Sequence, residues 1–194
     1  MNEWIDELVD LAAASERAVL VTVAGTRGSA SRKIGAKMIV TTTQTIGTIG
    51  GGQLEYQSMR VAVDMLNDQE MTLRSFPLGL SMGQSCGGAI EVLFEPIGDG
   101  IPSWLRDLSA LHGQREPAII TTRISQTNPS KIVVTADKVF GNDVLRTKSA
   151  MIARARQICR GARPQPEMFR NSMNRLLLLI STLPYSALAT LAQL

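Results

Sequence analysis

The sequence predicts an α/β fold in which helices flank a mixed β-sheet. Segments whose apolar residues recur every three or four positions, as in amphipathic helices, alternate along the chain with short runs rich in Val, Ile and Thr, as in strands. Hydrophobic residues make up 44% of the 194 residues and charged residues 19%, which excludes an intrinsically disordered chain. At about 150 residues per domain, the length lies between one average domain and two.

The first half of the chain begins with a helix, because Trp4, Ile5 and Leu8 recur at helical spacing among acidic residues. The run AVLVTVA at 18–24 is typical of a buried strand. The other elements expected in this half are a loop (25–35), a hairpin of two strands (37–42 and 45–49), a helix (53–66), a strand (71–76), a glycine-rich loop (77–88) and a strand (89–95).

The second half of the chain also contains helices and strands, and no internal repeat is apparent in the sequence. The expected elements are a helix (102–111), two strands (118–124 and 131–136), a helix (147–160), a Pro-containing linker (161–171), a strand (176–180) and a short helix (185–194).

Charge is distributed unevenly. Residues 1–97 carry a net charge of −4 and residues 98–194 a net charge of +7, most of it between 146 and 175. This basic stretch is either a solvated helix face that runs into a linker or a site for an acidic partner or anionic ligand. Nucleic acid is not expected as a partner, because the aromatic residues (4%) are scattered rather than interleaved with basic ones.

The ends of the chain indicate a cytoplasmic protein. The N-terminus is acidic, unlike a signal peptide, so both cysteines are expected to stay reduced. Residues 176–194 are uncharged, but only 176–180 are strictly apolar, so we expect a buried strand and a short helix rather than a membrane anchor.

Standard catalytic sets are mostly absent from the sequence. The one histidine, His112, stands at a predicted helix end, where a cation complements the helix dipole. One His and two distant Cys do not supply a zinc site.

Two glycine-rich loops are more informative. Gly50-Gly51-Gly52 lies between a strand and a helix, where backbone N–H groups favour an anion. The alternative is a tight structural turn, with Glu55 reaching back to cap the helix. Cys86 lies in GQSCGG, where the thiol is either a soft-atom ligand or a small buried residue, whereas Cys159 falls on an apolar helix face. The basic residues around the first loop favour either phosphate binding or ordinary surface charge; these are Arg27, Arg32, Lys33 and Lys37.

The segments VLVTVAGTRGSASRKIGAKMIV (19–40), IGTIGGGQLEY (46–56), FPLGLSMGQSCGGAIEVLFEP (76–96) and, more loosely, IVVTADKVFG (132–141) resemble the XdhC/CoxI family of molybdoenzyme accessory proteins. The resemblance implies a non-enzymatic chaperone that binds molybdenum cofactor (molybdopterin), protects it while a cysteine desulfurase supplies sulfur, and delivers it to xanthine dehydrogenase. It also implies that Cys86 contacts molybdenum or its sulfur. The cofactor-binding residues implied are Gln84, Cys86, Gly87, Gly88, Gly50, Gly51, Gly52, Gln53, Glu55 and Arg32.

The resemblance also implies a domain organisation. Residues 1–160 are expected to form the cofactor-binding domain, 161–174 a linker, and 175–194 the first strand and helix of a truncated Rossmann-type domain. The family's glycine fingerprint is missing after 176–180, so no NAD site is expected. A homodimer is a further expectation, because the last strand and helix need a partner for their apolar faces.

Two alternatives stay open. One is a redox or sulfur-transfer enzyme that uses Cys86 directly. The other is a truncated remnant of the accessory protein that no longer functions.

Overall fold

The computed structural model describes residues 3–28, 34–67, 70–78, 88–98, 100–124, 130–141, 149–161, 168–171 and 175–181. The chain forms two compact units. The first unit comprises residues 10–100, and the second comprises residues 1–9 together with 101–194. The helix α1 (Glu3–Ala13) therefore begins in the second unit and ends in the first.

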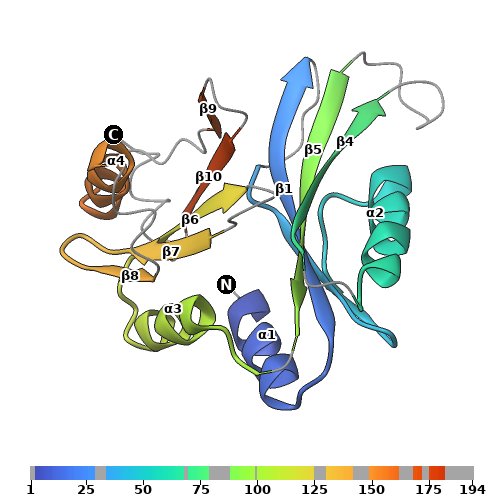
Figure 1. The fold of residues 1–194 in the computed structure, drawn as a ribbon, viewed down its shortest axis with the longest axis horizontal. Helices are drawn as coiled ribbons and strands as arrows, with labels where there is room; N and C mark the ends of the chain where they lie inside the picture. Colours follow the sequence, from blue (N-terminus) through green and yellow to red (C-terminus); the bar gives the residue numbers. More distant parts are fainter. Residues whose placement is uncertain are drawn as a thin grey trace. The chain divides into compact units, whose positions relative to one another are not determined.

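The first unit contains a five-stranded sheet with the strand order β3-β2-β1-β5-β4, in which every pair is antiparallel (Figure 1). Its elements are β1 (Ala18–Gly28), β2 (Lys37–Val40), β3 (Thr45–Gly47), α2 (Gly52–Asp64), β4 (Thr72–Leu78) and β5 (Gly88–Ile97).

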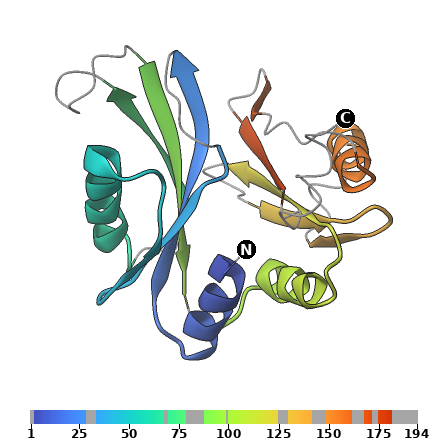
Figure 2. The same cartoon turned by 180° about the vertical axis from the view of Figure 1, so that it is seen from behind.

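The helix α2 covers one face of this sheet, as both views show (Figures 1 and 2). Alternate residues of β1, namely Val19, Val21 and Val23, are fully buried in the same core as Leu54 and Ala62 of α2. This is the pattern expected of a strand with one face under an amphipathic helix. Burying such side chains supplies about 1.5–3 kcal/mol each.

The second unit contains another five-stranded antiparallel sheet, with the order β8-β7-β6-β10-β9. Its elements are α3 (Ser103–Gly113), β6 (Ile119–Ile124), β7 (Ser130–Val134), β8 (Val139–Gly141), α4 (Ser149–Cys159), β9 (Met168–Asn171) and β10 (Arg175–Ser181). Ala155 and Ile158 of α4 pack on Ile119, Ile132 and Val134 of this sheet.

The helix α3 is anchored by its own apolar stripe, Leu105, Leu108 and Leu111, all buried. The ammonium group of Lys131, on β7, lies 4.0 Å from the ring centroid of Trp104 on α3. This cation–π contact links the helix to the sheet.

The two halves of the chain have the same order of elements, so the chain contains an internal repeat that the sequence did not reveal. The series helix–three strands–helix–two strands runs from α1 to β5 and again from α3 to β10. Both sheets have the third strand at one edge and the fourth strand of the series at the other. The α/β class is thus confirmed. The expected mixture of parallel and antiparallel pairs is not found among the described strands, since hairpins and helical returns make each described pair antiparallel.

Identical residues occupy equivalent positions in the two halves. From 3–22 and 103–122 the alignment has no gap, and its identities are Trp4 and Trp104, Leu8 and Leu108, Leu11 and Leu111, Glu16 and Glu116, Ala18 and Ala118, and Thr22 and Thr122. The two first helices also end alike, because Ser15 and Arg115 adopt φ angles of 55° and 57°.

The first hairpins of the two sheets match without a gap over 37–47 and 131–141. The hydroxyl oxygens of Thr41 and Thr135 each accept a bond from the backbone N–H three residues later. Gly47 and Gly141 both adopt positive φ, and a Cβ atom at either glycine would lie 2.8 Å from a backbone carbonyl oxygen of the preceding strand. Between the two matching stretches the first unit has a longer connection, and this difference hides the repeat in the sequence.

The expected loop at 25–35 is partly wrong, because β1 continues to Gly28. A bulge between Val23 and Gly25 keeps the strand in register with β5, so that Gly28 still pairs with Gly88. The glycines and polar side chains of this stretch concealed the strand, which is stabilised by pairing with the apolar β5.

The strand expected at 176–180 is confirmed as β10, whereas β9 was not expected. β9 lies within the predicted linker and β10 within the predicted Rossmann-type remnant, and β10 pairs with β6 in the second sheet. Linker composition therefore did not prevent strand formation. The family's domain division at 160 and 174 stays a prediction. In the described part of the chain, no helix combines the length and the apolar character needed to cross a bilayer.

Candidate functional site

The triple-glycine turn is a strained segment that only glycine tolerates well. Gly50, Gly51 and Gly52 have φ angles of 113°, 71° and 71°. Three consecutive positive values are costly for residues with a Cβ atom. The turn joins β3 to α2, and Gly51 occupies the N-cap position of the helix.

A carboxylate of the chain itself occupies the centre of this turn. One oxygen of Glu55, Oε2, accepts the backbone N–H of Ile49 and of Gly51, each at 3.0 Å. It also accepts a short bond from the hydroxyl of Thr48, and this hydroxyl in turn accepts the N–H of Gly50 at 3.0 Å. Of the two interpretations of the turn, this geometry supports the structural one. Glu55 holds these amides in the way expected of a capping carboxylate at a helix start.

The ends of three strands meet where the predicted cysteine loop begins and ends. Gly88, the first residue of β5, pairs with Gly28, the last of β1, and with Leu78, the last of β4. The segment between β1 and β2 that carries Arg32, and the segment between β4 and β5 that carries Cys86, therefore both start from this end of the sheet. Four predicted site residues lie outside the described residues, namely Arg32, Gln84, Cys86 and Gly87.

The glycine turn is reached from β3, which runs in the same direction as β1 because both are antiparallel to β2. The chain thus leaves Gly47 toward the end of the sheet at which β1 finishes. Gln53 is the second residue of α2 and is exposed. The topology accordingly sends the turn and both glycine-rich connections toward one end of the first sheet.

An ion pair that sequence reasoning missed lies at this end. The guanidinium of Arg27 makes a short salt bridge to Glu91, whose side chain is only 5% exposed. A buried carboxylate needs such compensation. An acidic residue within the apolar run of β5 was the available sequence signal. Arg27 is therefore paired within the protein. The ammonium of Lys37 donates to the hydroxyl of Thr22 at 3.2 Å. Two of the four basic residues predicted to bind phosphate thus make contacts within the protein instead.

Cys159 lies on the core face of α4, as its helical position predicted. Its Sγ donates to the carbonyl oxygen of Val134 at 3.4 Å. Burial, with a smaller contribution from the negative charge of Glu116, raises the pKa of this thiol from 9.0 to about 11. Cys159 is therefore unsuited to nucleophilic or ligand chemistry near neutral pH. The described residues also contain no group of three His, Cys, Asp or Glu side chains placed to hold a metal ion.

The fold and this site define a small α/β protein that gathers glycine-rich connections at one end of an antiparallel sheet. Residues 11–77 match the XdhC and CoxI family, and the resemblance drawn from the sequence is confirmed over this segment. The segment includes the triple-glycine turn and Glu55.

A solved structure from Bacillus halodurans, described as a xanthine dehydrogenase, is similar to this chain with a TM-score of 0.57 and 22% sequence identity. The similarity covers 71% of this chain and 44% of that one, so the chain spans less than half of its neighbour's length. At this identity the likeness concerns the fold. No curated protein matches the sequence.

Proposed function

We propose that this protein is an accessory factor that binds molybdenum cofactor, holds it during sulfuration and delivers it to xanthine dehydrogenase. The observation that carries the proposal is the match of residues 11–77 to the XdhC and CoxI family. The solved neighbour described as a xanthine dehydrogenase supports an accessory role in general. The partners that follow are xanthine dehydrogenase and a cysteine desulfurase, in the cytoplasm, with the accessory protein itself as a homodimer.

The proposed roles of the site residues differ between the two glycine-rich regions. Because Glu55 already accepts the amides of Ile49 and Gly51, we assign Gly50–Gly52, Gln53 and Glu55 to shaping the site rather than to binding the phosphate of the cofactor. A phosphate would need to displace a bound carboxylate from these amides. The phosphate contact is therefore assigned to Arg32.

Cys86 is the proposed contact to the cofactor's metal or its sulfur, because a thiolate is a soft ligand. Gln84, Gly87 and Gly88 flank it, and glycine lets a ligand approach the backbone closely. The start of β5 at Gly88 fixes one end of this connection, since Gly88 is paired on both sides. One thiol contact also suits a carrier, which must release what it binds.

Activation of xanthine dehydrogenase tests the proposal. Cofactor-free xanthine dehydrogenase is incubated with cysteine desulfurase, cysteine as the sulfur donor, molybdopterin carrying molybdenum, and this protein, and urate formation from xanthine is measured. We expect activation by the wild type and by Cys159→Ser, and loss of activation with Cys86→Ser. Activation without desulfurase would instead favour a sulfur-transfer enzyme. No activation by the folded wild type would favour a non-functional remnant.

A further inference from the structure

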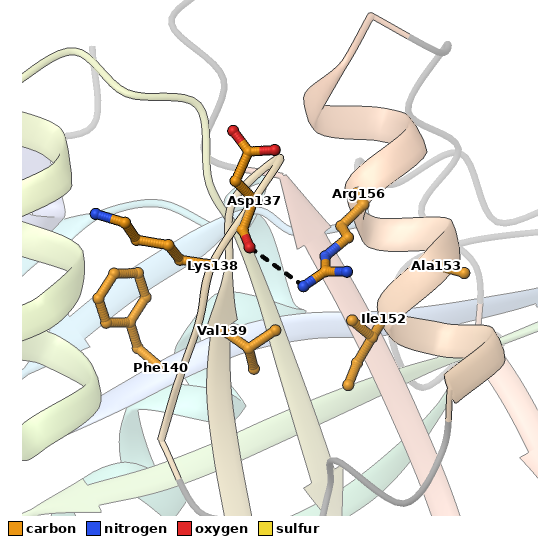
Figure 3. A pocket seen from close by; sticks show the side chains of 7 residues that line it. All are labelled: Asp137, Lys138, Val139, Phe140, Ile152, Ala153 and Arg156. Carbon is orange, nitrogen blue, oxygen red and sulfur yellow. Dashed lines mark hydrogen bonds between the residues drawn. The ribbon is translucent and has the colours of Figure 1, made fainter.

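The second unit contains a pocket of about 590 Å³ between the β7–β8 hairpin and α4 (Figure 3). Its lining is mixed, and the apolar part is contributed by Val139 and Phe140 from the hairpin and by Ile152 and Ala153 from the helix. Its polar groups come from Asp137, Lys138 and Arg156. This volume lies within the range of small-molecule sites.

The guanidinium of Arg156 carries a positive charge into this pocket. Its Nη2 donates to the backbone carbonyl oxygen of Asp137 at 3.3 Å, as Figure 3 shows, and this partner is uncharged. Its Nε is buried and has no hydrogen-bond partner among the described residues. The carboxylate of Asp137 pairs instead with Arg160, at 3.3 Å. A buried N–H without a partner is unfavourable, and a charge-assisted bond from this guanidinium to an anion would be stronger than its present bond to a neutral carbonyl.

The internal repeat shows that the fold does not require a cation at the position of Arg156. The core residues of α2 and α4 have the same spacing, so that Met59, Ala62, Met65 and Leu66 correspond to Ile152, Ala155, Ile158 and Cys159. This alignment places Val63 where the second unit has Arg156.

Both hairpin turns close through the same backbone and threonine bonds. The turn of the first unit is thus built without a guanidinium. Arg156 is therefore an addition to the second unit rather than part of the shared framework.

We propose that this pocket binds a small organic anion, in which a carboxylate or phosphate group meets Arg156 and a ring or hydrocarbon part packs against Val139 and Ile152. The site lies in the second unit and shares no residue with the proposed cofactor site, whose residues all belong to the first unit. Arg156 belongs to the basic stretch between residues 146 and 175. The proposal therefore agrees with the interpretation of that stretch as a site for an anionic ligand.

Phenyl phosphate is the probe that tests this site, with benzyl alcohol as the uncharged comparison. Binding to the full chain is measured by calorimetry and by NMR titration. We expect saturable binding of phenyl phosphate and much weaker binding of benzyl alcohol. Arg156→Gln should weaken phenyl phosphate binding by about tenfold or more, because a charge-assisted bond is lost.

Arg106→Gln is the matched control, because Arg106 also donates its Nη2 to a backbone carbonyl in this unit, at 3.3 Å, but does not line the pocket. We expect this variant to bind as the wild type does. Val139→Phe enlarges a side chain that faces Ile152 across the pocket in Figure 3 and leaves the Arg156 bond to the Asp137 carbonyl in place. It should also weaken binding strongly, which keeps the test informative if Arg156→Gln unfolds. No saturable binding to the wild type, or equal affinity in the pocket variants and the control, would overturn the proposal.

Discussion

The carboxylate of Glu55 accepts the backbone N–H of Gly51 at 3.0 Å, and this bond fixes the turn that starts α2. The same oxygen also binds the N–H of Ile49 and the hydroxyl of Thr48. A single side chain therefore organises a segment in which three consecutive residues have positive φ.

Replacing this carboxylate should destabilise the first unit. Glu55→Ala leaves the N–H groups of Ile49 and Gly51 without their acceptor, and we expect a loss of about 1–3 kcal/mol in the free energy of unfolding. Urea denaturation measures the change. Asp64→Asn, at the exposed end of the same helix, is the control and should leave stability nearly unchanged. Equal stability of Glu55→Ala and the wild type would contradict the capping role.

The repeated hairpin predicts that replacing Gly47 or Gly141 with alanine destabilises the protein to a similar extent. At Gly47 and Gly141 an added Cβ would lie 2.8 Å from the carbonyl oxygen of Lys37 or Lys131, and both residues have positive φ. Gly47→Ala and Gly141→Ala should each cost about 1–3 kcal/mol. Gly113→Ala, where nothing lies within 4 Å, should be neutral or slightly stabilising. Thermal unfolding compares the stability of the three variants. Wild-type stability of Gly47→Ala or Gly141→Ala would contradict the close contact described at that glycine.

The Arg27–Glu91 pair predicts a coupling between two positions on neighbouring strands. Arg27→Met removes the cation beside a buried carboxylate and should destabilise the protein by about 1–3 kcal/mol. Adding Glu91→Gln should recover part of that loss, because the buried charge is then gone as well. A double-mutant cycle in urea measures the coupling. Strictly additive effects would show that the two side chains do not interact.

The raised pKa of Cys159 predicts an unreactive thiol. In a Cys86→Ser background, alkylation of Cys159 by iodoacetamide should stay slow at pH 8 and accelerate only as the pH approaches about 11. Because the folded pKa lies above the unfolded value of 9.0, the contribution to stability is present below pH 9.0 and is lost as the pH rises through about 11. Rapid alkylation of the folded protein at pH 8 would contradict this burial.

Helices and strands with strong periodicity could be predicted from the sequence. The stripe of Leu105, Leu108 and Leu111 predicted α3, and the apolar run after Ala18 predicted β1. The end of β1 could not be predicted, because Gly25 and Gly28 are poor strand formers that are held by pairing with β5. The internal repeat was hidden since a core accepts different apolar residues of similar volume at most positions.

The site was only partly accessible from the sequence. The turn at the triple glycine and the capping role of Glu55 could both be predicted from local spacing. The Arg27–Glu91 pair and the pocket beside Arg156 depend on residues 64 and 19 positions apart that only strand pairing and helix packing bring together. The roles of Arg32 and Cys86 stay predictions.

Direct retention of the cofactor tests the central claim most plainly. Wild type, Cys86→Ser and Cys159→Ser are each incubated anaerobically with molybdopterin carrying the metal and passed through gel filtration, and molybdenum per protein chain is measured. Retention near stoichiometry by the wild type and Cys159→Ser, with loss in Cys86→Ser, is the predicted result. If folded wild type retains no more molybdenum than Cys86→Ser, the protein does not carry the cofactor in the way proposed.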